Sequence, residues 1–145
     1  MIRHQQVFEL LLITSCTYAM VRGRSEERLV ALVSVCATIA SAFAVSPLSV
    51  RYRGVEMGLL VIDLLVLAAF VLISLRSSRF WPLWVAGLQL TSSAAHFMKA
   101  IDEHLLPVAY GTAVAMWSYP ILIILAIATW RVRRTVHESL SVTPA

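Results

Sequence analysis

Apolar segments long enough to cross a lipid bilayer follow one another along most of the chain, with short polar connections between them. Four segments, at about 29–47, 57–75, 80–98 and 108–130, match the roughly 17–25 residues that a membrane-spanning helix needs. Hydrophobic side chains make up 59% and charged side chains 14% of the 145 residues, and the mean hydropathy is +0.81. A soluble domain of this length buries only about two-thirds of its surface. The sequence therefore predicts an integral membrane protein and excludes an ordinary soluble domain, a disordered chain and a disulfide-rich secreted module.

A fifth, shorter apolar segment at about 7–21 precedes these four and contains Glu9. We expect it to span as well, because an acidic residue near the end of a membrane helix is tolerated. The predicted fold is thus an all-α polytopic bundle of five transmembrane helices. The alternative is four spans preceded by an amphipathic helix in the membrane interface. A lipoprotein signal ending at Cys16 is a third interpretation, which the short apolar stretch before this cysteine disfavours.

Basic residues are unevenly divided between the two sides of this predicted bundle. One side carries Arg22, Arg24, Arg28, Arg76, Arg79, Arg131, Arg133 and Arg134, and the other carries Arg3, Arg51, Arg53 and Lys99. Since cytoplasmic loops carry the excess of basic residues, we expect a bacterial inner-membrane protein whose first and third connections and C-terminal tail, at 131–145, face the cytoplasm. The basic residues are scattered over short loops, which suits anionic lipid and argues against a nucleic-acid interface.

Local features of the predicted helices suggest how they pack. Small residues recur at helical spacing in the second helix, namely at Ser34, Thr38, Ser41 and Ala42. They predict close helix packing, within the chain or between copies. Pro120 predicts a kink inside the last helix. Cys16 and Cys36 fall within predicted helices, and we expect both to be small buried apolar residues.

Ionisable side chains interrupt the third and fourth predicted helices. Glu56 and Asp63 are nearly two helical turns apart and therefore project from one face. The fourth helix carries a polar stripe at positions i, i+3, i+4, i+7 and i+10, formed by Gln89, Ser92, Ser93, His96 and Lys99. The tight turn at 76–79 makes the two helices antiparallel neighbours, which places His96 at a depth between Glu56 and Asp63. Because ionisable groups in lipid are expensive, we expect these side chains to face inward.

The sequence thus predicts a polar pocket between these two helices, open toward the outer side of the membrane. Its predicted rim consists of Glu9, Arg53, Asp102, Glu103, His104 and Tyr110. In one interpretation the pocket is a structural network that sets the helix register. In another, Asp63 and His96 titrate along a proton or cation path. A metal site formed by His96, Asp63 and Glu56 is a third interpretation, and a quinone, lipid or haem site a fourth, although the residues lack any recognisable ligand spacing.

No catalytic motif accompanies these residues. The sequence contains no G-x-S-x-G elbow, no H-E-x-x-H and no phosphate-binding loop. We therefore assign no catalytic residue and favour a non-enzymatic role, that of an accessory or structural subunit of a membrane complex acting through helix–helix contacts. The partners would be the lipid bilayer and other membrane subunits or further copies of the chain. The alternative is a small oligomeric transporter or channel coupled to protons or cations, and the third is a metal-, quinone- or haem-binding membrane protein.

One segment carries a resemblance. The stretch Arg79-Phe80-Trp81-Pro82-Leu83-Trp84-Val85-Ala86-Gly87-Leu88-Gln89, together with residues 56–63, His96 and Tyr119-Pro120, resembles an uncharacterised family of small multispanning proteins of bacterial inner membranes. The resemblance extends from about Val50 to Arg131. It implies a helical membrane fold, and because that family has no known activity, it implies no mechanism.

Overall fold

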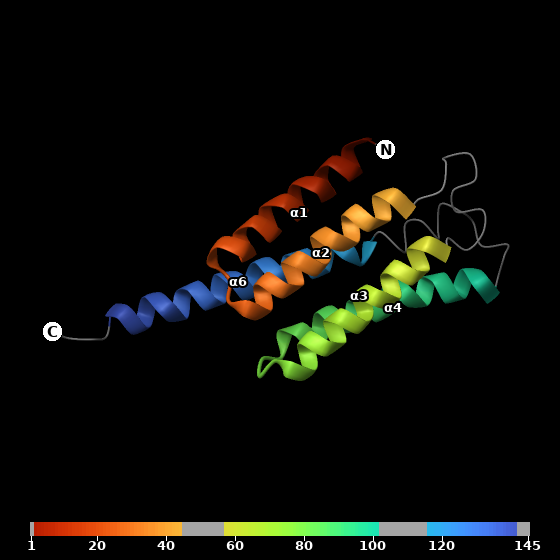
Figure 1. Cartoon of the computed structure of the whole chain (residues 1–145). Coiled ribbons are helices and arrows are strands. Elements are labelled where there is room, and N and C mark those ends of the chain that lie inside the picture. Colours follow the sequence, from red (N-terminus) through yellow and green to blue (C-terminus); the bar gives the residue numbers. More distant parts are fainter. Residues whose placement is uncertain (1, 45–56, 102–115, 142–145) are drawn as a thin grey trace.

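The computed structural model describes residues 2–44, 57–101 and 116–141, and within these ranges the chain forms five α-helices and no strand. The helices are α1 (Ile2–Arg22), α2 (Ser25–Ala44), α3 (Met57–Arg76), α4 (Trp81–Ile101) and α6 (Ser118–Ser141) (Figure 1). The prediction of an all-α helical bundle is therefore confirmed for the described part of the chain.

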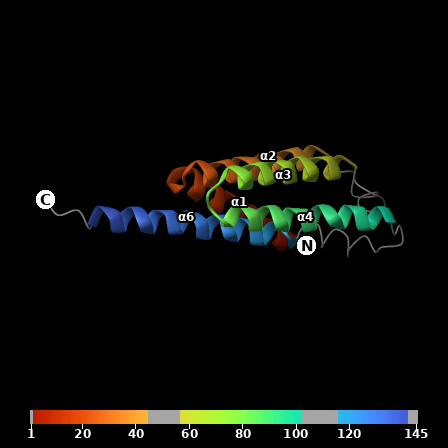
Figure 2. The ribbon, with the colours of Figure 1, turned by 90° about the horizontal axis from the view of Figure 1, so that it is seen from below.

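The helices are arranged as a ring. α1 packs on α2, α2 on α3 and α3 on α4, and α6 closes the ring by packing against both α4 and α1. Figures 1 and 2 show that α1, α3 and α6 run in one direction while α2 and α4 run in the other. The α1–α2 turn (residues 23–24), the α3–α4 turn (residues 77–80) and the C-terminal part of α6 consequently lie at one end of the bundle. We call this the turn end, and α6 extends past the other helices there.

Only Gly23 and Arg24 connect α1 to α2. A Cβ atom on Gly23 would lie 2.4 Å from the carbonyl oxygen of Ala19 and 2.6 Å from Cβ of Glu27, so a side chain at this position cannot fit without moving the backbone. The carboxylate of Glu27 accepts a hydrogen bond from the backbone N–H of Arg24 at 2.9 Å, which caps the first turn of α2. This cap explains why α2 begins at Ser25 rather than at the predicted residue 29.

The last helix differs most from its predicted span of 108–130. α6 begins at Ser118 and continues to Ser141, so the helix extends well into the segment predicted as a tail at 131–145. Pro120 lies in the first turn of α6, where its missing N–H breaks no helical hydrogen bond. Met116 is helical as well, and a turn at Trp117 separates it from α6, so the helix is interrupted just before Pro120 and the predicted kink stays a prediction. Residues 108–115 lie outside the described residues.

The helix bounds elsewhere are close to those predicted, with extensions at two ends. α1 begins at Ile2, before the predicted start at residue 7, and α4 continues to Ile101, beyond the predicted end at residue 98. Within the described residues, α2 and α3 are the helices long and apolar enough to cross a membrane by length and composition alone. Polar residues on one face of α4 and charged residues on α1 and α6 lower the mean hydropathy of those helices.

The buried core draws on every helix. Its members include Cys16 of α1, Val30 of α2, Phe70 of α3, Val85 of α4 and Leu125 of α6. α2 and α3 approach closely at one point, because a Cβ atom on Gly58 would lie 3.2 Å from Cβ of Ala44. Of the small residues predicted to pack, Ser34, Thr38 and Ser41 are half-buried and Ala42 is exposed, and the close approach to α3 is made by Ala44 instead.

Large apolar side chains also cover the outside of the bundle. Phe43 of α2 is 86% exposed and Leu75 of α3 is 76% exposed. Cys36 is exposed on α2, so the prediction that both cysteines are buried holds for Cys16 alone. Large apolar side chains therefore lie on the outside of the bundle as well as in its core, and the buried residues also include polar side chains such as Glu27 and His96.

Candidate functional site

The inward face of α4 is polar over about two helical turns. Gln89, Ser92, Ser93 and His96 lie on this face, and none of them is more than 7% exposed. Spacings of three and four residues place them on one side of the helix. One turn earlier, the same side carries the buried apolar residues Val85 and Ala86.

Asp63 of α3 is the acidic partner of these residues. Its Oδ1 accepts a hydrogen bond from Nε2 of Gln89 at 3.0 Å, and its Oδ2 accepts one from the hydroxyl of Ser92 at 3.0 Å. Nε2 of His96 lies 3.4 Å from the same Oδ2, which is within ion-pair distance when the imidazole is protonated. The structure therefore brings four of the predicted pocket residues together, and we call Asp63, Gln89, Ser92 and His96 the Asp63 cluster.

The geometry of the Asp63 cluster fixes the register of α3 against α4. Each carboxylate oxygen receives a donor from α4, and the Asp63 side chain is only 20% exposed. Sliding one helix past the other by a turn, about 5.4 Å, would break all of these contacts. A hydrogen bond to a charged group contributes about 1.5–3 kcal/mol. The observed register is therefore strongly preferred over registers in which one helix is shifted by a turn.

Ser93 lies beside this cluster without taking part in it. Its hydroxyl group makes no hydrogen bond within the described part of the chain, although the residue is only 1% exposed. A buried hydroxyl without a partner is unfavourable compared with an apolar group of the same size. Adjacent serines on one helix face therefore have opposite energetic roles.

No contact within the described part of the chain joins the remaining predicted site residues to the Asp63 cluster. Glu9 is exposed on α1. The side chain of Lys99 and the residues Glu56, Arg53, Asp102, Glu103, His104 and Tyr110 lie outside what the structure describes. Among the described residues, no group of three or more His, Cys, Asp or Glu could hold a metal ion. The metal hypothesis also requires Glu56, which is not described.

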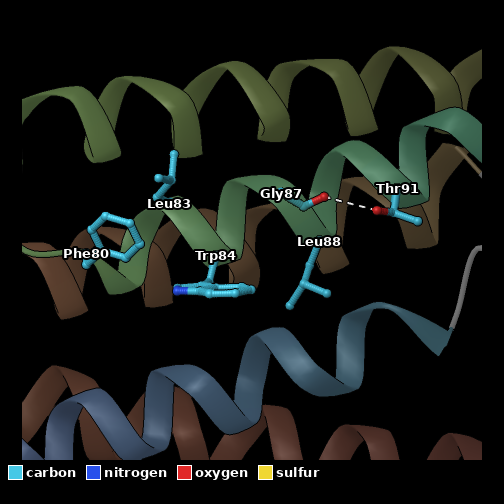
Figure 3. A pocket seen from close by; sticks show the side chains of 6 residues that line it. All are labelled: Phe80, Leu83, Trp84, Gly87, Leu88 and Thr91. Carbon is cyan, nitrogen blue, oxygen red and sulfur yellow. Dashed lines mark hydrogen bonds between the residues drawn. The ribbon is translucent and has the colours of Figure 1, made fainter.

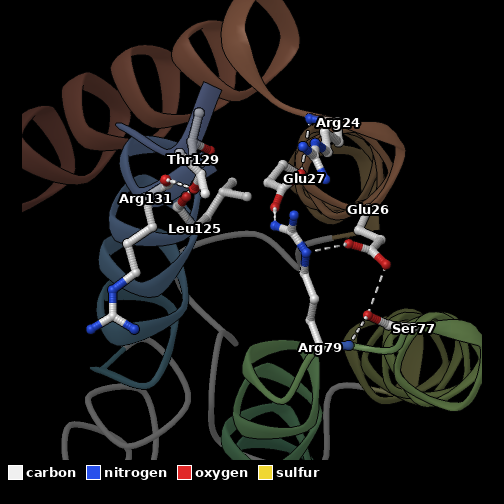
Figure 4. A network of polar contacts seen from close by, with 9 residues as sticks. Arg24, Glu26, Glu27, Ser77, Arg79, Leu125, Thr129 and Arg131 are labelled. Atoms are coloured by element: carbon white, nitrogen blue, oxygen red, sulfur yellow. Dashed lines mark hydrogen bonds and ion pairs between the residues drawn. The ribbon is translucent and has the colours of Figure 1, made fainter. Parts of the chain in front are cut away.

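A second polar cluster, which the sequence did not predict, lies at the turn end (Figure 4). The carboxylate of Glu27 is fully buried, and its Oε1 lies 3.0 Å from a terminal guanidinium nitrogen of Arg79. Nε of Arg79 lies 3.4 Å from Oε2 of Glu26, whose other oxygen accepts a hydrogen bond from the hydroxyl of Ser77 at 2.9 Å. We call Glu26, Glu27, Ser77 and Arg79 the Arg79 cluster. It joins the α1–α2 turn to the α3–α4 turn.

One sequence signal points to half of this second cluster. Ser25-Glu26-Glu27 places two acidic residues directly after a glycine-containing connection, which is typical of a helix start. That signal identifies the beginning of α2. The sequence does not show that the same two carboxylates meet Arg79, which lies 52 residues beyond Glu27.

The outward face of α4 carries a shallow groove of about 350 Å³ (Figure 3). Its lining is formed by Phe80, Leu83, Trp84, Gly87, Leu88 and Thr91. Nothing lies within 4 Å of the position that a Cβ atom on Gly87 would take. The hydroxyl of Thr91 donates to the carbonyl oxygen of Gly87 at 3.1 Å, so the polar atom turns back onto its own helix and the groove is apolar.

Comparisons with protein-family models, with curated proteins and with solved structures found no match to this chain. The resemblance of residues 79–89 to a family of small inner-membrane proteins therefore stays a prediction, and the functional argument rests on the geometry alone.

Proposed function

We propose that this chain is a multispanning integral membrane protein of the bacterial inner membrane, and that it serves as an accessory or structural subunit of a membrane complex. Its turn end faces the cytoplasm, and it acts through helix–helix contacts. The observation that carries the proposal is the combination of large apolar side chains on the outside of the bundle with polar side chains buried inside it. Phe43, Leu75 and similar side chains are exposed, while Glu27, Gln89 and His96 are buried. Lipid as the surrounding solvent accounts for both halves of this distribution.

The Asp63 cluster supports a structural role for the buried polar residues. Gln89 and Ser92 satisfy both oxygens of the carboxylate from within the hairpin. A polar network whose acceptors are met internally holds helices in register. This leaves the outer surface of the bundle to make contacts with other subunits.

The outward face of α2 is the surface that we expect to contact a partner helix. It presents the large side chains of Leu32, Ile39 and Phe43, which are exposed. The smaller residues Cys36 and Ala40 are exposed between them. Small residues among large ones let the backbones of two membrane helices approach closely.

Labelling of the native cysteine tests membrane residence. In the Cys16→Ala variant the exposed thiol of Cys36 is the only remaining cysteine. In intact membranes we expect a charged, water-soluble maleimide to fail to label it from either side, because lipid or a partner helix covers this face. After unfolding in detergent, the same reagent should react. Equal labelling by the charged reagent in folded protein would show that α2 faces water, and the proposal would be rejected.

Native gel electrophoresis of membranes solubilised in mild detergent tests the subunit role. We expect the 16.1 kDa chain to migrate in a larger assembly, and the double variant Ile39→Ala, Phe43→Ala to be released from it. The double variant Leu10→Ala, Ile13→Ala is the matched control, because those α1 side chains are 64% and 61% exposed. Migration of the unmodified protein as a single chain would contradict the proposal.

A second function is favoured by one specific distance. His96 and Asp63 lie 3.4 Å apart inside the bundle, and such pairs carry protons in membrane transporters. For a proton-coupled transporter, Asp63→Asn and His96→Gln should each abolish pH-dependent flux in liposomes while the protein stays folded. For a structural subunit, the same variants lower stability and leave the assembly intact.

A further inference from the structure

The groove on α4 begins next to a concentration of positive charge. Phe80, at its start, belongs to the α3–α4 turn, and the exposed Arg76 ends α3 just before that turn. In Figure 3, α3 and α6 flank α4 on either side of the groove. α6 brings Arg131, Arg133 and Arg134 to the same turn end, and all three are exposed. Both helices that flank α4 therefore carry exposed arginines at the turn end, the end at which the groove begins.

The apolar part of the groove has the length of one lipid leaflet. From Phe80 to Thr91 the helix rises about 16 Å, which is close to half of a hydrocarbon layer about 30 Å thick. Trp84 and Leu88 form the wall toward α6, and Leu83 forms the wall toward α3 (Figure 3). Gly87 leaves open space between them. This shape suits an extended acyl chain lying along α4.

We propose that an anionic phospholipid binds to this face of α4, with an acyl chain in the groove and its phosphate beside Arg76 and the arginines of α6. The inference rests on the proposed membrane location of the chain. Arg79 contributes little to the headgroup site, because the carboxylates of Glu26 and Glu27 already neutralise its charge. An exposed arginine near a membrane surface raises the affinity for a negative headgroup by about fivefold.

Charge also argues against a second copy of the chain as the occupant. All copies of a membrane protein have one orientation, so two α4 faces in contact would run parallel. The exposed arginines of both turn ends would then be adjacent and would repel each other. A headgroup with a net negative charge removes this repulsion, and a zwitterionic headgroup, whose phosphate is offset by its own cation, does so less completely.

Native mass spectrometry of the full chain in detergent tests the proposal. The probes are phosphatidylglycerol and phosphatidylcholine with identical acyl chains. We expect phosphatidylglycerol to remain bound and to be preferred by about fivefold or more. In Gly87→Leu, whose Cβ atom would have nothing within 4 Å, the leucine side chain should occupy the groove and the phosphatidylglycerol adduct should be lost. The matched control is Ala68→Leu, at an exposed position of α3, which should retain the adduct.

A charge variant separates the headgroup site from the acyl site. In Arg76→Gln, the preference for phosphatidylglycerol should fall by about fivefold while phosphatidylcholine binding stays unchanged. The matched control is Arg22→Gln, an exposed arginine at the end of α1, which should keep the preference. Equal retention of both lipids, retention of the adduct in Gly87→Leu, or dimers in place of lipid adducts would overturn the proposal.

The outcome for the membrane location is independent of this test. If Cys36 is not labelled in intact membranes and the two phospholipids bind alike, the lipid site is rejected and the membrane location stands. If Cys36 is labelled from water, both are rejected.

Discussion

The two polar clusters of this bundle use similar side chains but connect parts of the chain at different separations. In the Asp63 cluster, Asp63 meets Gln89 at a separation of 26 residues, across one hairpin. In the Arg79 cluster, Glu27 meets Arg79 at a separation of 52 residues, between two hairpins. The first fixes two neighbouring helices in register, whereas the second joins the two hairpins. The two clusters therefore hold the fold together at two levels, one within a hairpin and one between the hairpins.

The Arg79 cluster should carry the larger stability effect. Glu27→Ala removes a fully buried carboxylate that both pairs with Arg79 and caps α2. We expect a loss of about 3 kcal/mol in the free energy of unfolding, measured by detergent-induced unfolding, because breaking a buried ion pair is strongly destabilising. Glu26→Ala is the control, since Glu26 is 22% exposed and its pair with Arg79 should contribute about 1 kcal/mol. Equal losses would show that burial does not distinguish the two carboxylates.

The Asp63 cluster should show an intermediate effect. Asp63→Asn keeps the size of the side chain but offers one acceptor oxygen to two donors, Gln89 and Ser92. We expect a loss of about 2 kcal/mol in the free energy of unfolding. The double variant Asp63→Asn, Glu27→Ala should lose the sum of the single losses, because the clusters are about 20 Å apart along α3. A strongly non-additive result would mean that the two clusters form one network.

The smallest and sharpest contrast lies between two adjacent serines. Ser92→Ala removes a donor to Asp63 and should lower the free energy of unfolding by about 1 kcal/mol. Ser93→Ala removes a buried hydroxyl that has no partner within the described chain and should change stability little or raise it. Thermal unfolding in one detergent measures both. A larger loss for Ser93→Ala than for Ser92→Ala would reverse the assigned roles.

The same comparison shows what the sequence could predict. Helical periodicity alone placed Gln89, Ser92 and His96 on one face, and a short turn placed them opposite Asp63. Periodicity works there because both partners belong to consecutive helices with a tight connection. The bounds of α3 followed from hydropathy for the same local reason.

The other features depend on contacts that have no local pattern. The pairing of Glu27 with Arg79 requires knowing that two turns meet, and the ring order of the helices decides this. The start of α6 at Ser118 was missed because an apolar run across 108–130 hides a helix boundary, and proline fits both a kink and a first turn. The groove over Gly87 depends on which face of α4 is left uncovered.

The two-residue connection between α1 and α2 has a consequence for how the chain enters a bilayer. Two residues are too few to separate the helices, so α1 and α2 form one antiparallel hairpin. Under the proposed membrane location, the hydropathy of α2 would then carry the less apolar α1 into lipid with it, because the two helices would enter as a pair.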